Sequence, residues 1–371
     1  ADFVGRVGSK KYILLTFISE LRMIRIQGRR SECRPKRIRE FQVMKMNKSG
    51  LLSGLVLAGS LFASVSSVSA EEIKVGIANF GEHPQLNAAI AGFKEAMAEN
   101  GFVEGKDVSY SESHTNFDAS LVPQMITKLQ SENPKLIYTI TTPVSQIAKQ
   151  ALAGSGIPIV FSAVTDPVAA KLVPSWEAGD EGMTGASDLQ DIAAVLEFTR
   201  KLLPDAKHLA LPYNPGEAND VALLEKVEAL APAAGFSVVA VGIDNVNDIQ
   251  QRITSVAGKA DVIYTPASNL IQPAIAAVSA AARQIGVPIV NSDSSAVANG
   301  TVPASFSVDY SQVGLNAGKI AAEILKGKSP ADIPPSAPSY ETHAPMISKS
   351  AAAAFGIEIP AEFNDCGCIV E

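Results

Sequence analysis

Hydrophobic and polar residues alternate in a regular plan over most of the chain, with short apolar runs separated by longer amphipathic stretches. The run 73–78 predicts a strand, and after it Leu86, Ile90, Phe93 and Met97 recur at the spacing of one helix face. Strands that alternate with helices across short links are typical of right-handed βαβ units, in which the strands form a parallel sheet.

This plan occurs in two successive series. In the first, further strands are expected at 108–111, 136–140 and 157–162, with helices at 120–130 and 144–153. In the second, strands are expected at 208–211, 237–241, 262–265 and 287–291, with helices at 193–203, 218–233, 246–257 and 272–285. Two such series predict two similar α/β lobes.

Three further segments predict how the lobes are joined. The glycine-containing segment 180–188 is expected to cross first, helix 312–326 to return, and the proline-rich segment 330–338 to cross again. The predicted fold is therefore α/β, with two Rossmann-like lobes that contain parallel sheets and a three-strand hinge. The N-terminal lobe is expected to hold residues 71–186 and 296–332, and the C-terminal lobe residues 187–295 and 333–371.

Residues 44–70 have the pattern of a secretory signal peptide. Lysines precede the apolar run 51–63, and small residues follow it up to Ala70. The run is shorter than the roughly 20 residues that span a bilayer; a buried core helix is the alternative. We therefore expect cleavage after Ala70, a periplasmic location, and a mature protein that is not embedded in the membrane.

Residues 1–43 precede this signal, are basic and lack a hydrophobic pattern. We interpret them as a non-native N-terminal extension, with translation starting at Met44 or Met46. A basic nucleic-acid-binding arm at 34–39 is the alternative, although no pair of helices with helix-turn-helix spacing accompanies it.

Charge is distributed unevenly along the 371 residues. Residues 1–70 hold 13 Lys and Arg against 4 Asp and Glu, so the rest of the chain holds 18 basic and 34 acidic residues. An acidic body repels nucleic acid and anionic lipid, so no nucleic-acid partner is expected.

Cysteines occur only at positions 33, 366 and 368. The lobes therefore lack an internal disulfide framework, a thiolate metal cluster and a cysteine nucleophile. The tail sequence Cys366-Gly367-Cys368 leaves three alternatives: a frayed tail, a tight disulfide, or metal capture. No cofactor or metal is expected.

Ligands of open parallel sheets bind beyond the carboxyl ends of the strands, so residues after the predicted strands are candidates for binding. In the first lobe, His83 could donate to a ligand carboxylate, and Phe80 could cover an apolar group. The hydroxyls of Thr141, Thr142 and Ser145, at the start of a helix, suit an anion. The alternative for His83 and for the three hydroxyls is helix capping.

Further candidates follow other strands. Thr165 and Asp166 could pair with a ligand ammonium, although Asp before Pro also starts turns. In the second lobe, Tyr213 offers a stacking face, and the remaining candidates offer polar contacts: Asn214, Glu217, Asn219, Asn269 and Asp293.

Several stretches together resemble the tryptophan/tyrosine-type substrate-binding proteins of ABC transporters. The stretches are 83–87, 157–168, 183–185, 203–207, 213–219, 308–310, and 324–327 through 333–334. The resemblance spans 73–360 in collinear order. It implies a type I periplasmic-binding-protein fold, delivery of cargo to a membrane permease and ATPase, and an aromatic amino acid as cargo. The family usually has Asp where Asn87 stands, and an Asp-Asn pair where Ser268-Asn269 stands.

The sequence therefore predicts a monomeric, extracytoplasmic solute-binding protein of an ABC importer, with an amino acid or similar zwitterion as ligand. A different solute, such as a nucleoside, sugar or peptide, is the first alternative, and a ligand-sensing regulator is the second. An enzyme is not expected. Two-lobed Asp/Glu racemases use a cysteine pair, and no Gly-x-Ser-x-Gly elbow, His-rich metal cluster or Gly-rich phosphate loop is present.

Overall fold

The computed structural model describes residues 72–371. The predicted N-terminal extension and signal peptide lie outside the described residues.

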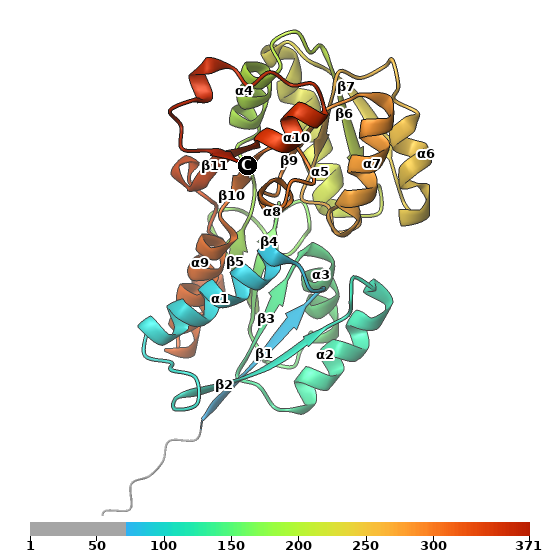
Figure 1. The fold of residues 1–371 in the computed structure, drawn as a ribbon. Coiled ribbons are helices and arrows are strands. Elements are labelled where there is room, and N and C mark those ends of the chain that lie inside the picture. Colours follow the sequence, from blue (N-terminus) through green and yellow to red (C-terminus); the bar gives the residue numbers. More distant parts are fainter. Residues whose placement is uncertain (1–71) are drawn as a thin grey trace, which may run out of the picture. The chain divides into compact units, whose positions relative to one another are not determined.

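A parallel sheet forms the centre of the first lobe (Figure 1). Its spatial order is β2-β1-β3-β4-β5, with β1 (Ile73–Asn79), β2 (Val108–His114), β3 (Leu136–Ile140), β4 (Ile159–Val164) and β5 (Met183–Ser187). The helices that cover its two faces are α1 (Pro84–Glu99) and α9 (Tyr310–Leu325) on one, and α2 (Val122–Ser131) and α3 (Thr142–Ala151) on the other.

Strand β3 shows why this sheet is apolar on both faces. Leu136, Tyr138 and Ile140 pack in the core under α1 and α9, whereas Ile137 packs in the core under α2 and α3. Helices cover both faces of a sheet built from βαβ units, so its strands read as nearly continuous apolar runs.

Helix α9 comes from the C-terminal part of the chain and packs closely against α1. At Gly314 of α9, a Cβ atom would collide with the carbonyl oxygen of Ala89, and at Gly92 of α1 with that of Ser311. These glycines allow the two helix backbones to approach, which attaches α9 to the first lobe.

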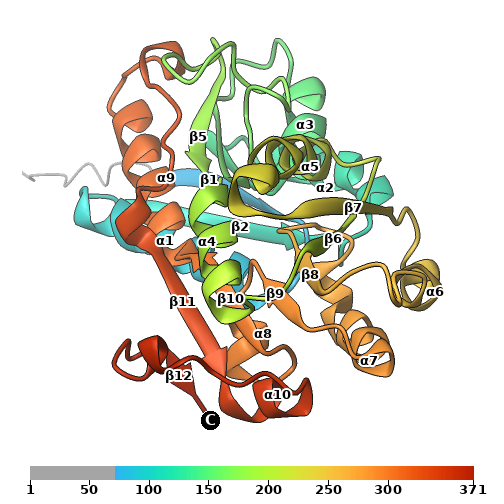
Figure 2. The same cartoon turned by 90° about the horizontal axis from the view of Figure 1, so that it is seen from above.

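The second lobe contains a larger sheet of order β12-β11-β10-β9-β8-β6-β7 (Figure 2). Its strands are β6 (His208–Tyr213), β7 (Ser237–Gly242), β8 (Val262–Thr265), β9 (Ile289–Asn291), β10 (Ala304–Val308), β11 (His343–Ser348) and β12 (Ile369–Val370). Strand β11 runs antiparallel to β10, and the other pairs are parallel. The helices are α4 (Ile192–Leu202), α5 (Ala218–Leu230), α6 (Ile249–Thr254), α7 (Ile275–Ile285), α8 (Ser295–Ala298) and α10 (Lys349–Ala354).

The predicted two-lobed fold with a three-strand hinge is confirmed. The chain crosses between the two sheets after β5, between β10 and α9, and between α9 and β11. One predicted boundary differs. The sequence placed residues from 296 onward in the first lobe, but β10 pairs with β9 and β11 in the second sheet. Its Ala304 and Phe306 are buried in the second-lobe core, so the chain returns to the first lobe only after Val308.

The C-terminal tail contains a disulfide between Cys366 and Cys368. Cys368 is buried in the second-lobe core, and β12 then pairs with β11. Of the three alternatives left by the sequence, the structure has the disulfide. Among residues 72–371, no cluster of three or more metal-binding side chains occurs. No helix in the same range is long and apolar enough to cross a membrane.

Candidate functional site

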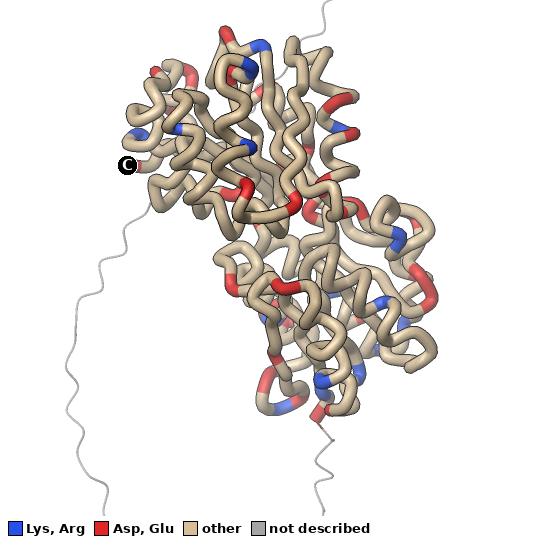
Figure 3. Tube along the Cα trace, turned by 90° about the vertical axis from the view of Figure 1, so that its right-hand side faces the viewer, with Lys and Arg blue, Asp and Glu red and all other residues tan. Residues whose placement is uncertain are grey.

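A pocket with a cavity volume of about 30 Å³ lies where the carboxyl ends of the strands of the two lobes meet. This volume is below the range of about 300–1,000 Å³ that is common for small-molecule sites, so a ligand of amino-acid size would require the lining to open. The first lobe, the crossing segments and the second lobe all contribute to its lining: His83, Gln85, Leu86, Phe117, Thr141, Ala163, Asp188, Ala267, Ser268, Asn269, Gln272, Pro273 and Tyr310. The boundary between the lobes is marked by recurring acidic positions (Figure 3), and no Lys or Arg is among these described lining residues.

The first-lobe wall contains two residues in unusual backbone conformations. Thr141 has φ +83° at the end of β3, and Ala163 has φ +52° near the end of β4. Side chains other than glycine rarely occupy this region, and such strain tends to gather at functional sites. Both residues line the pocket, so the strained backbone lies at the place where strand ends face the second lobe.

Three side-chain atoms on this lining are buried and have no hydrogen-bond partner. They are Gln85 Nε2, Thr141 Oγ1 and Asp188 Oδ1, out of seven such atoms in the described part of the chain. Buried polar groups in folded proteins nearly always have partners, so each exception asks for an explanation. Here an amide donor, a hydroxyl and a carboxylate oxygen gather around one cavity.

Asp188 lies on the first crossing, directly after β5, and is completely buried. The Tyr310 hydroxyl, on the second crossing, donates to its Oδ2. Burial raises the pKa of Asp188, and the hydroxyls of Tyr310 and Thr165 oppose this shift. Burial and the neighbouring Asp188 charge also raise the pKa of Tyr310, which therefore stays a hydrogen-bond donor. The site thus contains a buried carboxylate without a cationic partner on its lining.

The start of α3 carries the predicted hydroxyl group cluster, but its members have different environments. Ser145 Oγ donates to the Thr141 carbonyl at 2.8 Å and lies 2.9 Å from Thr139 Oγ1, so it holds the first helical turn. Thr142 is buried, and neither Thr142 nor Ser145 lines the pocket. The first hydrogen bond of the turn runs from Ser145 N to Thr141 O. The amides of Thr142 and Val144 therefore precede the intrahelical ladder.

The phenylalanine on the lining is Phe117, in the loop after β2, rather than Phe80. Phe80 is 4% exposed and lies behind it, with ring centroids 5.6 Å apart in an edge-on arrangement. Phe117 itself has φ +65°.

The second-lobe wall is held by an internal hydrogen-bond network. Asn269 donates from its backbone N and its Nδ2 to Glu217 Oε2, at 3.1 and 2.8 Å. Gln272 Nε2 donates to the Pro266 carbonyl at 2.6 Å and to Asn291 Oδ1 at 2.8 Å. The side chains of this wall are therefore fixed by neighbours before any ligand arrives.

The other candidates near the start of α5 lie one layer behind this wall. Asn214 Nδ2 donates to Glu217 Oε1 at 3.0 Å, and Asn219 Nδ2 donates to Asp220 Oδ1 at 2.9 Å. Tyr213 packs against the second-lobe core. Burial and the nearby Glu217 charge raise the pKa of Asp220 to about 8.

His83 and Asp293 meet across the two lobes, with His83 Nε2 3.4 Å from Asp293 Oδ2. Asp293 also accepts hydrogen bonds from the backbone N and the Oγ of Ser295, at 2.7 and 2.8 Å. Burial lowers the pKa of His83, while the charge of Asp293 opposes this shift. His83 lines the pocket and Asp293 does not.

Thr165 and Asp166 form part of a local turn. Asp166 Oδ1 accepts from the backbone N of Val168 and Ala169 at 3.0 and 2.9 Å. The Thr165 carbonyl accepts from Ser187 Oγ at 2.9 Å. Neither residue lines the pocket.

The structure therefore brings three sequence candidates onto the lining: His83, Thr141 and Asn269. The lining also contains four residues that are not among the sequence candidates: Gln85, Phe117, Asp188 and Tyr310. Asp188 could have been found by the rule that selected Thr141, since it directly follows a strand. The run Met183–Ser187 has few β-branched residues, so the segment was interpreted as a crossing rather than as a strand.

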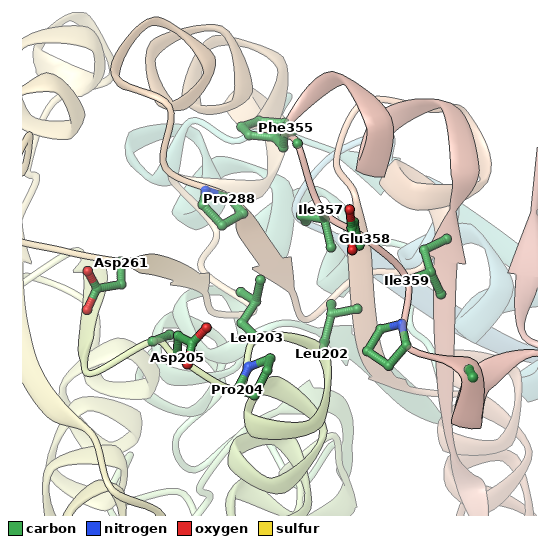
Figure 4. A pocket seen from close by; sticks show the side chains of 14 residues that line it. Leu202, Leu203, Pro204, Asp205, Asp261, Pro288, Phe355, Ile357, Glu358 and Ile359 are labelled. Carbon is green, nitrogen blue, oxygen red and sulfur yellow. The ribbon is translucent and has the colours of Figure 1, made fainter.

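A larger hollow lies elsewhere in the second lobe (Figure 4). It is lined by residues that precede strands, such as Asp205 and Ala206 before β6, Asp261 before β8 and Pro288 before β9. Because ligands of parallel sheets bind at the opposite, carboxyl ends, the interlobe pocket is the stronger candidate.

Residues 74–365 match the family described as ABC transporter substrate binding protein. The chain belongs to this family. A tyrosine-binding protein of Clostridioides difficile is 33% identical over 305 residues, which cover 80% of this chain and 88% of the relative. Substrate-binding proteins of ABC importers act outside the cytoplasm and bind solutes for a permease and an ATPase.

Solved structures agree with this membership. A conserved domain protein from Vibrio cholerae has a TM-score of 0.75 and 32% identity, and covers 81% of this chain and 100% of its own. An ABC domain from Streptococcus pneumoniae in complex with L-Trp has the same TM-score and coverage, with 28% identity. A ligand-free, open substrate binding protein from Clostridium difficile has 31% identity and a TM-score of 0.62.

Proposed function

We propose that this substrate-binding protein captures an aromatic amino acid in the pocket between its lobes and presents it to an ABC permease. It acts as a monomer in the periplasm, after residues 44–70 have directed export and have been removed behind Ala70. The protein performs no chemistry on its ligand.

The unpaired polar atoms on the pocket lining are the observation that carries this proposal. Asp188 Oδ1 is a buried acceptor without a cation, and a ligand ammonium would supply the charge that it lacks. Gln85 Nε2 and Thr141 Oγ1 can donate to a carboxylate. One acceptor that favours a cation and two donors that favour an anion match a zwitterion.

Two features support the carboxylate end. The amides of Thr142 and Val144 lie at the positive end of the α3 dipole, next to the Thr141 hydroxyl. The α3 helix is 10 residues long, so its dipole adds to the effect of the hydroxyl.

The aromatic part of the ligand is supported by the apolar lining and by the relatives. Phe117, Leu86 and Pro273 provide apolar surface around the cavity. The names of two relatives refer to tyrosine and to L-Trp. Structures with bound myo-inositol and allitol are only 15% and 14% identical and support the fold alone.

The similarity to solved structures also supports a ligand-holding conformation. The chain is more similar to the L-Trp complex than to the ligand-free, open structure, at similar sequence identity. The contact between His83 and Asp293 joins the two lobes at a residue of the pocket lining, His83. Closure of this kind would enclose the ligand without any covalent step.

The test is a calorimetric titration of the protein, purified without residues 1–70, with L-tryptophan, L-tyrosine and L-phenylalanine. Tryptamine, which lacks the carboxylate, and indole-3-propionate, which lacks the ammonium, separate the two polar ends. We expect the amino acids to bind and both analogues to bind at least tenfold more weakly. Binding of a sugar or nucleoside in place of the amino acids would contradict the proposal.

A further inference from the structure

The loop after β8 supplies two polar residues of the pocket wall, Ser268 and Asn269. Neither stands on a helix or strand, so other groups must fix their orientation. Asn269 is held by two hydrogen bonds to one oxygen of Glu217, which does not itself line the pocket. Ser268 is 1% exposed and forms a hydrogen bond to Asp220, another residue behind the wall.

Glu217 and Asp220 form a carboxyl pair that is bridged by one side chain. Asn219 Nδ2 donates to Asp220 Oδ1 at 2.9 Å and to Glu217 Oε2 at 3.3 Å. Asp220 is 1% exposed, and its Oδ2 accepts from the backbone N of Asn214 at 2.7 Å. Two negative charges in such a buried cluster repel each other, so the cluster is more stable when Asp220 carries a proton.

We propose that Glu217 and Asp220 are positioning residues that orient Asn269 and Ser268, and that loss of the Asp220 proton weakens ligand binding. This inference rests on the proposed function, because the wall that these residues hold belongs to the same pocket. When Asp220 ionises, the repulsion acts on Glu217, and the hydrogen bonds that Glu217 accepts from Asn269 weaken with it.

Among the charged groups on the elements around Asp220, Glu217 is the one that acts on the Asp220 carboxyl group. On α5, Glu225, Lys226 and Glu228 are exposed and lie further along the helix. The loop after β8 contributes the neutral Ser268 and Asn269, and the end of β6 contributes the half-buried phenol of Tyr213.

Helix α4 also packs against α5, but its charged groups have other partners. Lys201 and Glu197 pair with each other at 2.7 Å, and Arg200 donates to the carbonyls of Pro204 and Ala206. Burial and Glu217 raise the pKa of Asp220 to about 8, which places its ionisation just above neutral pH.

The experiment measures the dissociation constant of L-tryptophan between pH 7 and pH 9 for the wild type and for Asp220→Asn. If only the protonated form binds, the wild-type dissociation constant rises about tenfold over this range, since the competent fraction falls by that factor. Asparagine has the shape of a protonated aspartic acid and does not ionise. Asp220→Asn should therefore show only the rise that comes from the ammonium of the ligand, which both proteins share.

Two further variants separate positioning from a general loss of structure. In Glu217→Gln, the dissociation constant should show only the rise that comes from the ligand ammonium, because no charge remains at position 217 for an ionised Asp220 to repel. Glu225→Gln, on the exposed side of the same helix, should follow the wild-type profile. A purely structural role would change the dissociation constant by the same factor at every pH. Identical pH profiles for the wild type and Asp220→Asn would overturn the inference.

Hydrogen exchange of residues 266–271 provides a measurement that needs no ligand. We expect the wild-type loop to lose more protection than the Asp220→Asn loop between pH 7 and pH 9, and equal losses would overturn the inference. Failure of L-tryptophan, L-tyrosine and L-phenylalanine to bind at any pH would instead contradict the proposed function, while the exchange result still decides the role of Asp220.

Discussion

The two walls of the interlobe pocket are built in opposite ways. On the first-lobe side, Gln85 Nε2 and Thr141 Oγ1 are buried without partners, and Thr141 and Ala163 have positive φ. On the second-lobe side, Asn269 and Gln272 are held by several hydrogen bonds within their own lobe.

This difference indicates a division of labour between the walls. The first lobe carries strained and unsatisfied groups, which are unfavourable until a ligand arrives. The second lobe offers a surface whose shape is already fixed, so little side-chain entropy is lost when the lobes close on the ligand. Asp188, on the crossing between them, provides the charge that neither wall contains.

The largest expected effect follows from replacing Asp188 by asparagine. The variant keeps an acceptor for Tyr310 but removes the charge, so ligand affinity should fall by about 2–3 kcal/mol, as for a lost charged hydrogen bond. Calorimetry with L-tryptophan measures the loss. Asp166→Asn is the matched control, because its carboxylate binds the turn amides of Val168 and Ala169. An equal loss in both variants would show that charge near the cleft, rather than contact, is responsible.

The next prediction concerns the second-lobe wall, whose side chains are held by hydrogen bonds within their own lobe. Thr265 Oγ1 donates to the buried Asn291 Oδ1 at 2.6 Å. Thr265→Val should lower the free energy of unfolding by about 0.5–1.5 kcal/mol, because Asn291 Oδ1 loses one of its two donors and keeps Gln272 Nε2. Urea denaturation measures this loss. A variant as stable as the wild type would indicate that the second-lobe network contributes nothing to preorganisation.

Thr141→Val tests the first-lobe wall, which carries buried polar atoms without partners. It should lower ligand affinity without lowering the free energy of unfolding. The shape and β-branching are kept, so the strained backbone is unchanged, and only the unpaired hydroxyl is removed. Ligand affinity should fall by about 1 kcal/mol, while the stability of the ligand-free protein should stay the same or rise. Calorimetry and urea denaturation on one preparation give both values. A loss of stability without a loss of affinity would reverse the comparison.

The smallest expected effect is the response of the interlobe contact to acid. Burial lowers the pKa of His83, so the folded state favours the neutral ring. Its contribution to stability is therefore complete above the ordinary His pKa of about 6.5 and is lost as the pH falls below it. Thermal unfolding between pH 7.5 and pH 5 should show a smaller decrease for His83→Gln than for the wild type. A wild type that gains stability in acid would mean that His83 binds Asp293 as a charged pair.

Much of the fold could be predicted because each element carries a local signal. The apolar steps from Leu86 to Met97 agree with α1, and the β-branched run 262–265 agrees with β8. Strand β10 gave no such signal, since its five residues alternate small, hydroxyl and apolar types. Its position depends on parallel pairing with β9 and on antiparallel pairing with β11. Strand β11 lies beyond α9 in the sequence.

The site was less predictable for a related reason. Thr141 could be selected because it follows an obvious strand, whereas Asp166 and Ser145 follow the same rule and serve local structure. A post-strand position shows which end of the sheet a residue occupies, but not whether its side chain is already bonded. That distinction appears only when neighbouring loops are in place.

By itself, the sequence determined the two α/β lobes, the hinge and the edge of each sheet where a ligand would bind. These follow from hydrophobic periodicity and from short links, which are local properties of the chain. Only the tertiary structure decided which polar atoms remain unpaired. It brings Gln85, Thr141 and Asp188 from three separate segments to one cavity, and it assigns Glu217 to the support of Asn269. The reason is that a buried polar atom is unpaired only when no neighbouring group forms a hydrogen bond with it. Those neighbouring groups come from distant parts of the sequence.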